Sequence, residues 1–259
     1  MNIIGIIPAR MASSRFPGKP LATICGIPMV GHVYQRSRMS KMLQDVYVAT
    51  CDREIFAYIE SIGGRAVMTA DTHERASDRC AEAMIKIEKT AGDSIDIVVM
   101  IQGDEPMLYP EMVDKAIEPL LRDDMTHVVN LMGNLKNREE HDDPNEVKVV
   151  VDKNNFALYF SREPIPSWKK GAKALTMLKQ ICIIPFRRDY LLKFNSLPQM
   201  PLEIAESVDM LRILEHGDKV KMVPVDFDTY SVDTPEDLKK VEFLMEKDPL
   251  FPSYKNKIG

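Results

Sequence analysis

Short apolar runs alternate with segments of helical periodicity along the first half of the chain. Residues 3–7 form a near-continuous apolar run, as expected of a strand that is buried on both faces of a parallel sheet. Further strands are predicted at 46–49, 65–68 and 97–101, and helices at 29–39, 53–62, 76–87 and 110–121. This alternation is typical of the α/β class, in which helices cover both faces of a mostly parallel sheet.

The second half of the chain follows a less regular pattern. Strands are predicted at 128–132, 147–151, 157–160 and 180–186, joined by polar loops that contain proline. Helical patterns return at 202–215 and 235–246, with a strand at 219–225 between them. Because no flexible linker or internal repeat interrupts the chain, we expect one domain over residues 1–259, with an inserted antiparallel subregion at about 133–186.

Composition excludes several classes of protein. The 259 residues carry a formal charge of −5, whereas a protein that binds nucleic acid usually has an excess of basic residues. No apolar run approaches the roughly 18–20 residues that span a bilayer. The four cysteines show neither metal-binding nor redox spacing. We therefore expect a cytoplasmic protein with reduced thiols and with neither a nucleic-acid nor a membrane partner.

The charge is unevenly distributed along the chain. Residues 1–44 contain six Lys and Arg and no Asp or Glu, a formal +6, which leaves −11 for residues 45–259. A locally basic segment in an acidic chain is compatible with one small polyanion held near the N-terminus.

Ligands of open α/β sheets bind beyond the carboxyl ends of the strands. Four segments meet this description: 8–20, 50–52, 102–106 and 230–234. The first combines small residues at 12–14 with the cations Arg10, Arg15 and Lys19. This combination indicates a phosphate-binding loop, although it lacks the glycines of a P-loop or a dinucleotide fingerprint. A solvated basic loop is the alternative interpretation.

Asp104 and Asp233 each follow a predicted strand. A carboxylate in that position can hold Mg²⁺ together with the phosphates of a substrate. Helix capping is the alternative, since Asp233 precedes a Thr-Pro-Glu helix start in which Thr234 is a good N-cap. Two acids and a basic loop together predict metal-assisted phosphoryl or nucleotidyl transfer.

Six motifs occur in order between residues 2 and 246. They are Ile-Pro-Ala-Arg, Ser-x-Arg-x-Pro-Gly-Lys-Pro-Leu, Gln-Gly-Asp-Glu-Pro, Ala-Leu-Tyr-Phe-Ser-Arg, Leu-Arg-Ile-Leu-Glu-x-Gly and Val-Asp-Thr-Pro-Glu-Asp-Leu. Together they resemble the CMP-KDO synthetase (3-deoxy-manno-octulosonate cytidylyltransferase) family. The resemblance implies a Rossmann-like, glycosyltransferase-A-like nucleotidyltransferase fold and a homodimer. It also implies Mg²⁺-dependent transfer of CMP from CTP to an acidic sugar for surface polysaccharide synthesis, with release of pyrophosphate.

The same resemblance implies roles for individual residues. Lys19, Arg15 and Asp104 would be catalytic, and Asp104 and Asp233 would bind Mg²⁺. The nucleotide would be bound by Pro8, Ala9, Arg10, Ser14, Arg15, Lys19, Ser77, Arg79 and Gln102. The sugar acid would be bound by Arg162, Gln180, Glu206 and Asp209.

Two segments depart from the pattern of this family. Residues 73–79 read His-Glu-Arg-Ala-Ser-Asp-Arg where the family has His-x-Ser-Gly-Thr-Glu-Arg. In segment 180–187, Gln180 stands where the family has a histidine, which the resemblance implies would face the sugar acid. Because specificity depends on such polar contacts, we expect a KDO-like or modified acid, including an amino-substituted one. A phosphonate or nonulosonate acceptor and a non-catalytic CTP-binding protein are the alternatives.

Overall fold

The structure is a computed structural model that describes residues 1–12, 16–167 and 176–256. Two compact units are present, and we call them unit 1 (Met1–Asp114 and Asp228–Gly259) and unit 2 (Lys115–Phe227). Unit 2 encloses the subregion at about 133–186 that the sequence predicts as an insertion. Among the helices of the described ranges, none is long and apolar enough to cross a membrane.

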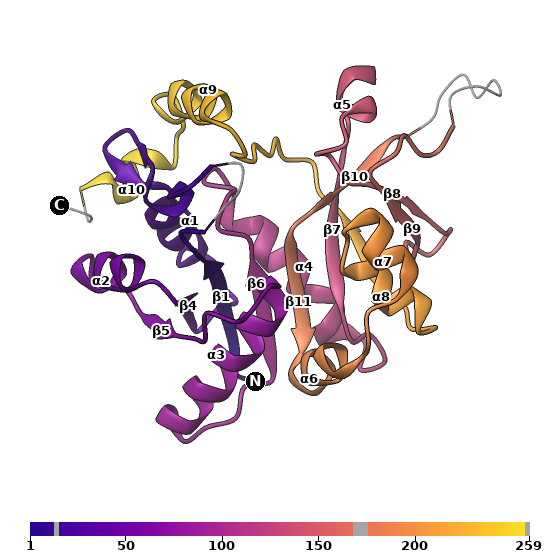
Figure 1. Ribbon diagram of the computed structural model, residues 1–259, viewed down its shortest axis with the longest axis horizontal. Coiled ribbons are helices and arrows are strands. Elements are labelled where there is room, and N and C mark those ends of the chain that lie inside the picture. The colour runs from indigo at the N-terminus through magenta and orange to yellow at the C-terminus, as the bar shows by residue number, and fades with distance from the viewer. Residues whose placement is uncertain (13–15, 168–175, 257–259) are drawn as a thin grey trace. The chain divides into compact units, whose positions relative to one another are not determined.

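Unit 1 is built on parallel strands in the order β6-β1-β4-β5 (Figure 1). Their bounds are Ile97–Ile101, Ile3–Ala9, Asp45–Thr50 and Ala66–Met68. All five residues of β6 are buried, as the apolar runs of the sequence require of strands that are covered on both faces. The predicted α/β alternation is confirmed for this part of the chain.

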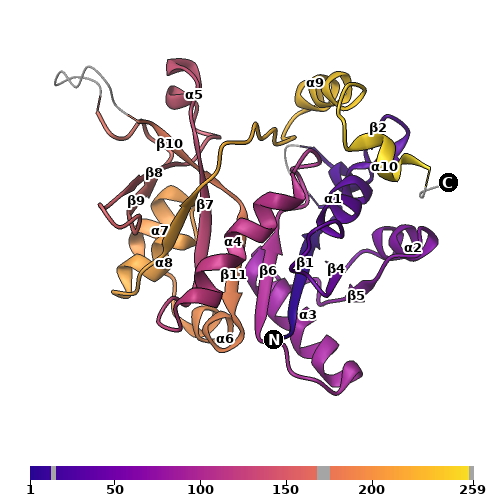
Figure 2. The same ribbon diagram turned by 180° about the vertical axis from the view of Figure 1, so that it is seen from behind.

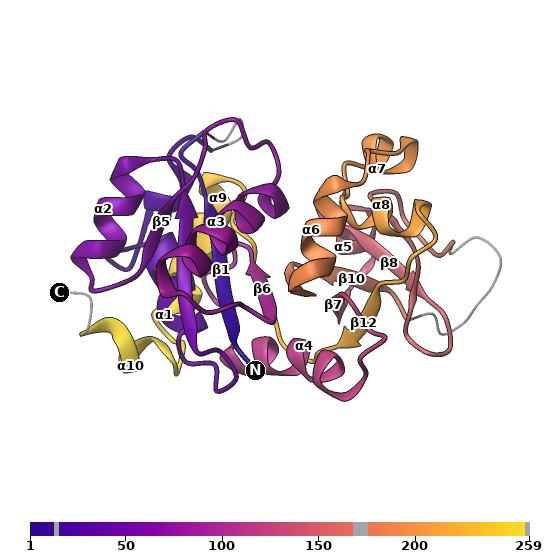
Figure 3. The same cartoon turned by 90° about the horizontal axis from the view of Figure 1, so that it is seen from below.

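Helices cover both faces of the unit 1 sheet. The helices that connect its strands are α1 (Met29–Ser37), α2 (Arg53–Ser61) and α3 (Ala76–Ala91). Right-handed crossovers place α1 and α2 on one face and α3 on the other (Figure 3). The next helix, α4 (Pro110–Arg122), begins in unit 1 and ends in unit 2.

The C-terminal segment of unit 1 packs against its N-terminal half. Helices α9 (Pro235–Met245) and α10 (Phe251–Lys255) lie near α1 and near the small hairpin of β2 (Thr23–Ile24) and β3 (Ile27–Pro28), as Figures 1 and 2 show. Side chains from these elements form one buried apolar cluster that includes Ile24, Val232, Met245 and Phe251. This packing brings residues 228–234 back to the end of β6, where Val232 N–H donates to the Asp104 carbonyl over 2.9 Å.

Unit 2 contains a second sheet, in the order β12-β7-β10-β8-β9. The bounds of these strands are Lys221–Pro224, Val129–Asn134, Leu178–Ile181, Lys148–Val151 and Ala157–Ser161. Only β12 and β7 pair in parallel, so the antiparallel character predicted for this region is confirmed. The other elements of unit 2 are β11 (Ile183–Arg187), α5 (Arg138–Asp142), α6 (Arg188–Ser196), α7 (Pro201–Glu206) and α8 (Met210–Glu215).

Two elements that the sequence predicts in unit 2 are each divided into two in the structure, so both predictions are wrong in this respect. The strand predicted at 180–186 is divided between β10 and β11. The helix predicted at 202–215 is two helices, because Ser207 adopts a left-handed conformation with φ 52°. Beside the break, the Glu206 carbonyl accepts a 2.8 Å hydrogen bond from Arg162 Nε instead of continuing the helix.

Candidate active site

The loop after β1 folds back on itself at Gly18. Gly18 N–H donates to the Met11 carbonyl over 3.0 Å, and Gly18 has a φ of 75°, which favours glycine. A short 3₁₀ turn, η1 (Lys19–Leu21), follows directly and carries Lys19 at its first position. Ser14 and Arg15, both predicted to bind phosphate, lie outside the described residues.

The Lys19 ammonium joins the two acids that the sequence predicts as metal ligands. Lys19 Nζ lies 2.9 Å from Asp104 Oδ2 and 3.2 Å from Asp233 Oδ1. The Val232 carbonyl accepts a third hydrogen bond from Lys19 Nζ over 2.9 Å. Three segments far apart in the sequence therefore meet at one cation.

Asp233 does not cap the helix that follows it. Thr234 is the N-cap of α9, and its hydroxyl accepts from Asp237 N–H while the Asp237 carboxylate accepts from Thr234 N–H. With capping supplied by Thr234, the Asp233 carboxylate is available to Lys19.

The turn after β6 packs tightly against the end of β1. A Cβ atom at Gly103 would lie 3.2 Å from the Pro8 carbonyl, so the close approach of the two backbones favours glycine. This approach places Gln102 and Asp104 beside the loop that begins at Arg10.

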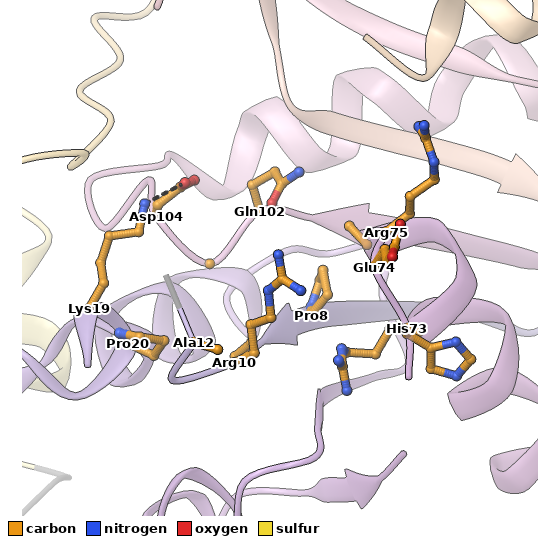
Figure 4. A pocket seen from close by; sticks show the side chains of 14 residues that line it. Pro8, Arg10, Ala12, Lys19, Pro20, His73, Glu74, Arg75, Gln102 and Asp104 are labelled. Atoms are coloured by element: carbon orange, nitrogen blue, oxygen red, sulfur yellow. Dashed lines mark hydrogen bonds and ion pairs between the residues drawn. The ribbon is translucent and has the colours of Figure 1, made fainter. Parts of the chain in front are cut away.

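A cavity of about 360 Å³ lies at these strand ends, within unit 1. Seven of the predicted site residues line it: Pro8, Ala9, Arg10, Lys19, Arg79, Gln102 and Asp104. Figure 4 shows the Lys19 ammonium directed at the Asp104 carboxylate, with His73, Glu74 and Arg75 at the other end of the cavity. Ser77, also predicted for this site, is buried in α3 and is not one of the lining residues among those described.

Arg79 contributes a buried donor to the wall of the cavity. Arg79 is only 3% exposed, and its Nη1 donates to the Ala70 carbonyl and to Thr69 Oγ1. Its Nη2 is buried and has no hydrogen-bond partner among the described residues. Since a buried donor without an acceptor is costly, this nitrogen fits an oxygen atom of a ligand.

Glu82 anchors the loop that carries His73, Glu74 and Arg75. Its carboxylate accepts from Ala70 N–H over 2.9 Å and also binds His73 Nε2 and Lys86 Nζ. Partial burial raises the pKa of Glu82, but these three partners outweigh burial and lower the pKa to about 2. Glu82 therefore stays ionised and holds this side of the cavity against α3.

Asp52 anchors the loop after β1. It follows β4, and its Oδ2 accepts from Met11 N–H in the loop after β1 over 2.8 Å. The sequence marked 50–52 as a strand end but assigned no role to Asp52, and it did not point to Glu82 at all. An acid at a strand end was the available signal for Asp52, whereas Glu82 is indistinguishable in sequence from a solvated helix residue.

The predicted acceptor residues lie in unit 2. Arg162 N–H donates to Glu206 Oε2 over 2.8 Å, and Arg162 Nη1 donates to the Pro144 carbonyl over 2.9 Å. Asp209 is the N-cap of α8, three residues after Glu206. Gln180, on β10, directs its Nε2 to Asn130 Oδ1 at 2.6 Å. The structure thus brings Arg162 and Glu206 into contact, and their role in binding the sugar acid stays a prediction.

Lys148 is a buried cation of unit 2 to which the sequence did not point. Lys148 is 0% exposed, and its Nζ donates to the carbonyls of Asp143 and Arg162 over 2.7 and 2.5 Å. Burial lowers the pKa of Lys148. Lys148 therefore ties the loop at Asp143 to the segment that carries Arg162.

The Asp104 and Asp233 carboxylates fit a divalent cation of the Mg²⁺ type. Their oxygens already surround one positive group, and oxygen is the ligand that Mg²⁺ requires. No cluster of three or more His, Cys, Asp or Glu suited to a metal occurs within residues 1–12, 16–167 and 176–256. The remaining ligands of a Mg²⁺ ion here would be substrate phosphates and water.

Comparison with known proteins agrees with this chemistry. The family profile described as cytidylyltransferase matches residues 4–221. The chain is 41% identical over 251 residues to the 3-deoxy-manno-octulosonate cytidylyltransferase of Geotalea uraniireducens (strain Rf4), covering 93% of this chain and 98% of that protein. It belongs to this family of cytidylyltransferases. The same enzyme of Thermodesulfovibrio yellowstonii is 42% identical over 249 residues, covering 93% of this chain and 97% of that one.

Solved structures show the same relationship. This cytidylyltransferase superposes on CMP:2-keto-3-deoxy-manno-octonic acid synthetase complexed with CTP with a TM-score of 0.88 and 39% identity, covering 95% of this chain and 99% of that one. The 4-diphosphocytidyl-2C-methyl-D-erythritol synthase of Anaerococcus prevotii shares only the fold, with a TM-score of 0.61 and 13% identity over 95% of this chain and 98% of that one. The predicted nucleotidyltransferase fold and enzyme class are confirmed.

Proposed function

We propose that this cytidylyltransferase transfers CMP from CTP to KDO, with release of pyrophosphate and a requirement for Mg²⁺. One observation carries the proposal: the cavity at the ends of β1 and β6 is lined by Arg10, Lys19, Gln102 and Asp104. Cations for a triphosphate, an amide for a base and a carboxylate for a metal are the parts that nucleotidyl transfer needs. The chain also superposes over 95% of its length on a synthetase complexed with CTP.

The reaction exchanges one bond to the α-phosphorus of CTP for another. The anomeric hydroxyl of KDO attacks that phosphorus in line, the bond to the bridging oxygen of pyrophosphate breaks, and the hydroxyl proton passes to water. Arg10 and Lys19 would stabilise negative charge on the transferring and departing phosphates, as would Arg15. Mg²⁺, held by Asp104 and Asp233, would supply further neutralisation of the same charge.

Nucleotide recognition would use the other groups of the cavity wall. The Arg79 Nη2 donor lacks a partner among the described residues, so an oxygen of the nucleotide would remove the cost of burying it. Gln102 offers both a donor and an acceptor from its carboxamide, which matches the donor and acceptor groups of cytosine. His73, Glu74 and Arg75 would close the side of the cavity that Glu82 fixes.

An amino-substituted KDO is a second candidate acceptor. Asn130 Nδ2 donates to the carbonyls of Leu131 and Ile181, so Asn130 must offer its Oδ1 to Gln180. Gln180 therefore directs Nε2 to Asn130 and keeps its own carboxamide oxygen for another donor. Such an oxygen can accept a hydrogen bond from an ammonium group of the acceptor. A protonated histidine, which the family has at this position, would instead repel that group.

Two further expectations belong to the proposal. A homodimer is supported by exposed apolar side chains on unit 2, where Leu158, Leu202 and Ile204 are 61%, 41% and 63% exposed. A cytoplasmic location is supported by the absence of disulfides among the described residues. Sedimentation of the purified protein tests the first, and dimer dissociation on Ile204→Asp would assign the surface.

The test of the proposed reaction is identification of its product. The protein is incubated with CTP, Mg²⁺ and either KDO, an amino-substituted KDO, a phosphonate or a nonulosonate, and the products are analysed by mass spectrometry. A CMP adduct of KDO with equimolar pyrophosphate supports the proposal. CTP binding without an adduct of any acid would instead indicate a non-catalytic protein, and an adduct of one other acid alone would replace KDO.

A further inference from the structure

All three hydrogens of the Lys19 ammonium are engaged by unit 1. Lys19 Nζ is 2.9 Å from Asp104 Oδ2, 2.9 Å from the Val232 carbonyl and 3.2 Å from Asp233 Oδ1. A protonated lysine has three N–H donors and no acceptor. Lys19 therefore cannot donate to a phosphate without giving up at least one of these partners.

The ammonium is part of a closed arrangement rather than a loose surface contact. The Lys19 side chain is 14% exposed, and the side chains of Asp104 and Asp233 are 30% and 22% exposed. Val232, whose carbonyl binds Lys19, also donates from its N–H to the Asp104 carbonyl over 2.9 Å. Lys19, Asp104 and the 232–233 segment thus support one another.

The same two carboxylates would serve a divalent metal. The Lys19 ammonium neutralises part of the negative charge with which the two carboxylates would attract a second cation. A metal ion on these oxygens would also repel an ammonium a few ångströms away, because both carry positive charge. Lys19 and a metal ion therefore compete for the two acids.

We propose that Lys19 is an internal counter-ion of the metal site, which holds Asp104 and Asp233 before nucleotide binds and moves to a phosphate oxygen when CTP and the metal enter. The inference rests on the proposed function, since it takes the metal ligands from it. A triphosphate offers the ammonium a new anionic partner at the moment when the carboxylates gain a metal. Each of the two ligands thus lowers the cost of binding the other.

Two consequences follow for binding. The metal alone binds weakly, because it must displace Lys19 with no phosphate to receive the ammonium. CTP raises metal affinity, and by reciprocity the metal raises CTP affinity by the same factor. Neutralising Lys19 removes the competitor and should raise the affinity for metal in the absence of nucleotide.

The experiment titrates Mn²⁺ into the nucleotide-free protein and follows free Mn²⁺ by electron paramagnetic resonance, since Mn²⁺ shares the oxygen ligands of Mg²⁺. Lys19→Met should bind Mn²⁺ at least about tenfold more tightly than wild type, about 1.4 kcal/mol at 25 °C. Lys19→Arg retains the charge and should bind as weakly as wild type. Lys41→Met removes an exposed lysine of unit 1 and controls for net charge.

Further variants keep the outcome decisive. Adding Asp104→Asn to Lys19→Met should abolish the gain, which assigns the tighter binding to the carboxylate pair. Lys19→Gln replaces Lys19→Met if circular dichroism shows that the latter is unfolded. Equal Mn²⁺ affinity of wild type and the neutral variants overturns the inference and leaves the proposed reaction standing. No Mn²⁺ binding by any variant, even with CTP present, overturns the metal role in the proposed function as well.

Discussion

Arg36 and Asp248 form an ion pair that is almost entirely buried, with Nη2 2.6 Å from Oδ1 and side-chain exposures of 0% and 1%. Arg36 also donates from Nη1 to the Leu108 carbonyl over 3.3 Å and from Nε to Tyr254 Oη over 3.1 Å. Leu108 belongs to the segment after Asp104, and Asp248 and Tyr254 belong to the C-terminal segment that follows Asp233. One arginine on α1 thus fastens both acid-bearing segments of unit 1.

Asp248→Asn should destabilise the protein by about 3–5 kcal/mol, because it leaves the buried Arg36 charge without its counter-ion. The free energy of unfolding, measured by urea denaturation, checks this value. Glu118→Gln is the matched control, since it breaks the exposed Arg122–Glu118 pair, which should contribute at most about 0.5 kcal/mol. A loss below about 1 kcal/mol for Asp248→Asn would show that the pair does not fasten the C-terminal segment.

The sequence predicted the sheet of unit 1 well because its central strands, β1 and β6, are buried and almost entirely apolar. It did not predict α10, whose helical stretch of five residues is held by the contacts of Phe251 and Tyr254 rather than by a long periodic pattern. The break at Ser207 was missed for a related reason, since the apolar periodicity continues through it and only the contact with Arg162 reveals it.

The residues of the candidate site also fall into those that the sequence could predict and those that it could not. Residues at strand ends, such as Arg10, Gln102 and Asp104, were predictable because topology places strand ends together. The supporting contacts of Asp52 and Glu82 were not, because each depends on a backbone N–H that the fold brings to a surface acid. The meeting of Lys19 with both Asp104 and Asp233 likewise needs the C-terminal segment to return to β6.

His32 should make the protein less stable as the pH falls from about 6.5 to 4. Its Nε2–H donates to the Ile24 carbonyl and its Nδ1 accepts from the Tyr254 hydroxyl, so the folded protein holds the neutral ring. Burial lowers the pKa of His32 to about 4, against an ordinary value of 6.5. The unfolded chain therefore binds a proton in this window that the folded one does not, and stability is lost on acidification, by about 3 kcal/mol in total.

Unfolding free energies measured between pH 7 and pH 4 test this dependence. The slope of the unfolding free energy against pH reports how many more protons the unfolded state binds than the folded state. In His32→Gln this number should be lower by up to one proton, even if the variant is less stable at every pH. Protonation of Glu82, whose pKa is lowered to about 2, acts below pH 4.5 and is separable from the His32 effect. Parallel curves for wild type and His32→Gln would contradict the assignment.

Gly31 and Tyr58 fit together across α1 and α2 without room for a methyl group. A Cβ atom at Gly31 would clash with the Tyr58 hydroxyl, which is buried and has no hydrogen-bond partner among the described residues. Gly31→Ala should therefore cost about 1–3 kcal/mol, whereas Tyr58→Phe should be neutral or stabilising. The double variant should recover part of the loss, and strictly additive thermal shifts of the two single variants would rule out the clash.

Glu82→Gln should weaken CTP binding although Glu82 is not one of the residues that line the cavity. The substitution removes the charge that binds His73 and Lys86, so the loop 73–75 loses its anchor while the lining residues stay the same. We expect the KM for CTP to rise several-fold with a smaller change in kcat, measured by pyrophosphate release at saturating acceptor. Glu88→Gln, farther along α3, is the control. An unchanged KM would mean that the loop does not contribute to nucleotide binding.

The most direct test of the proposed function compares pyrophosphate release by wild type and Asp104→Asn from CTP and KDO in the presence of Mg²⁺. The wild type should release one pyrophosphate per CMP-KDO formed. Asp104→Asn should be slower by at least about 100-fold, roughly 2.7 kcal/mol of transition-state stabilisation, and should bind CTP with Mg²⁺ less tightly. No pyrophosphate from the wild type with KDO, or an Asp104→Asn variant that turns over and binds like the wild type, would contradict the proposed reaction at this site.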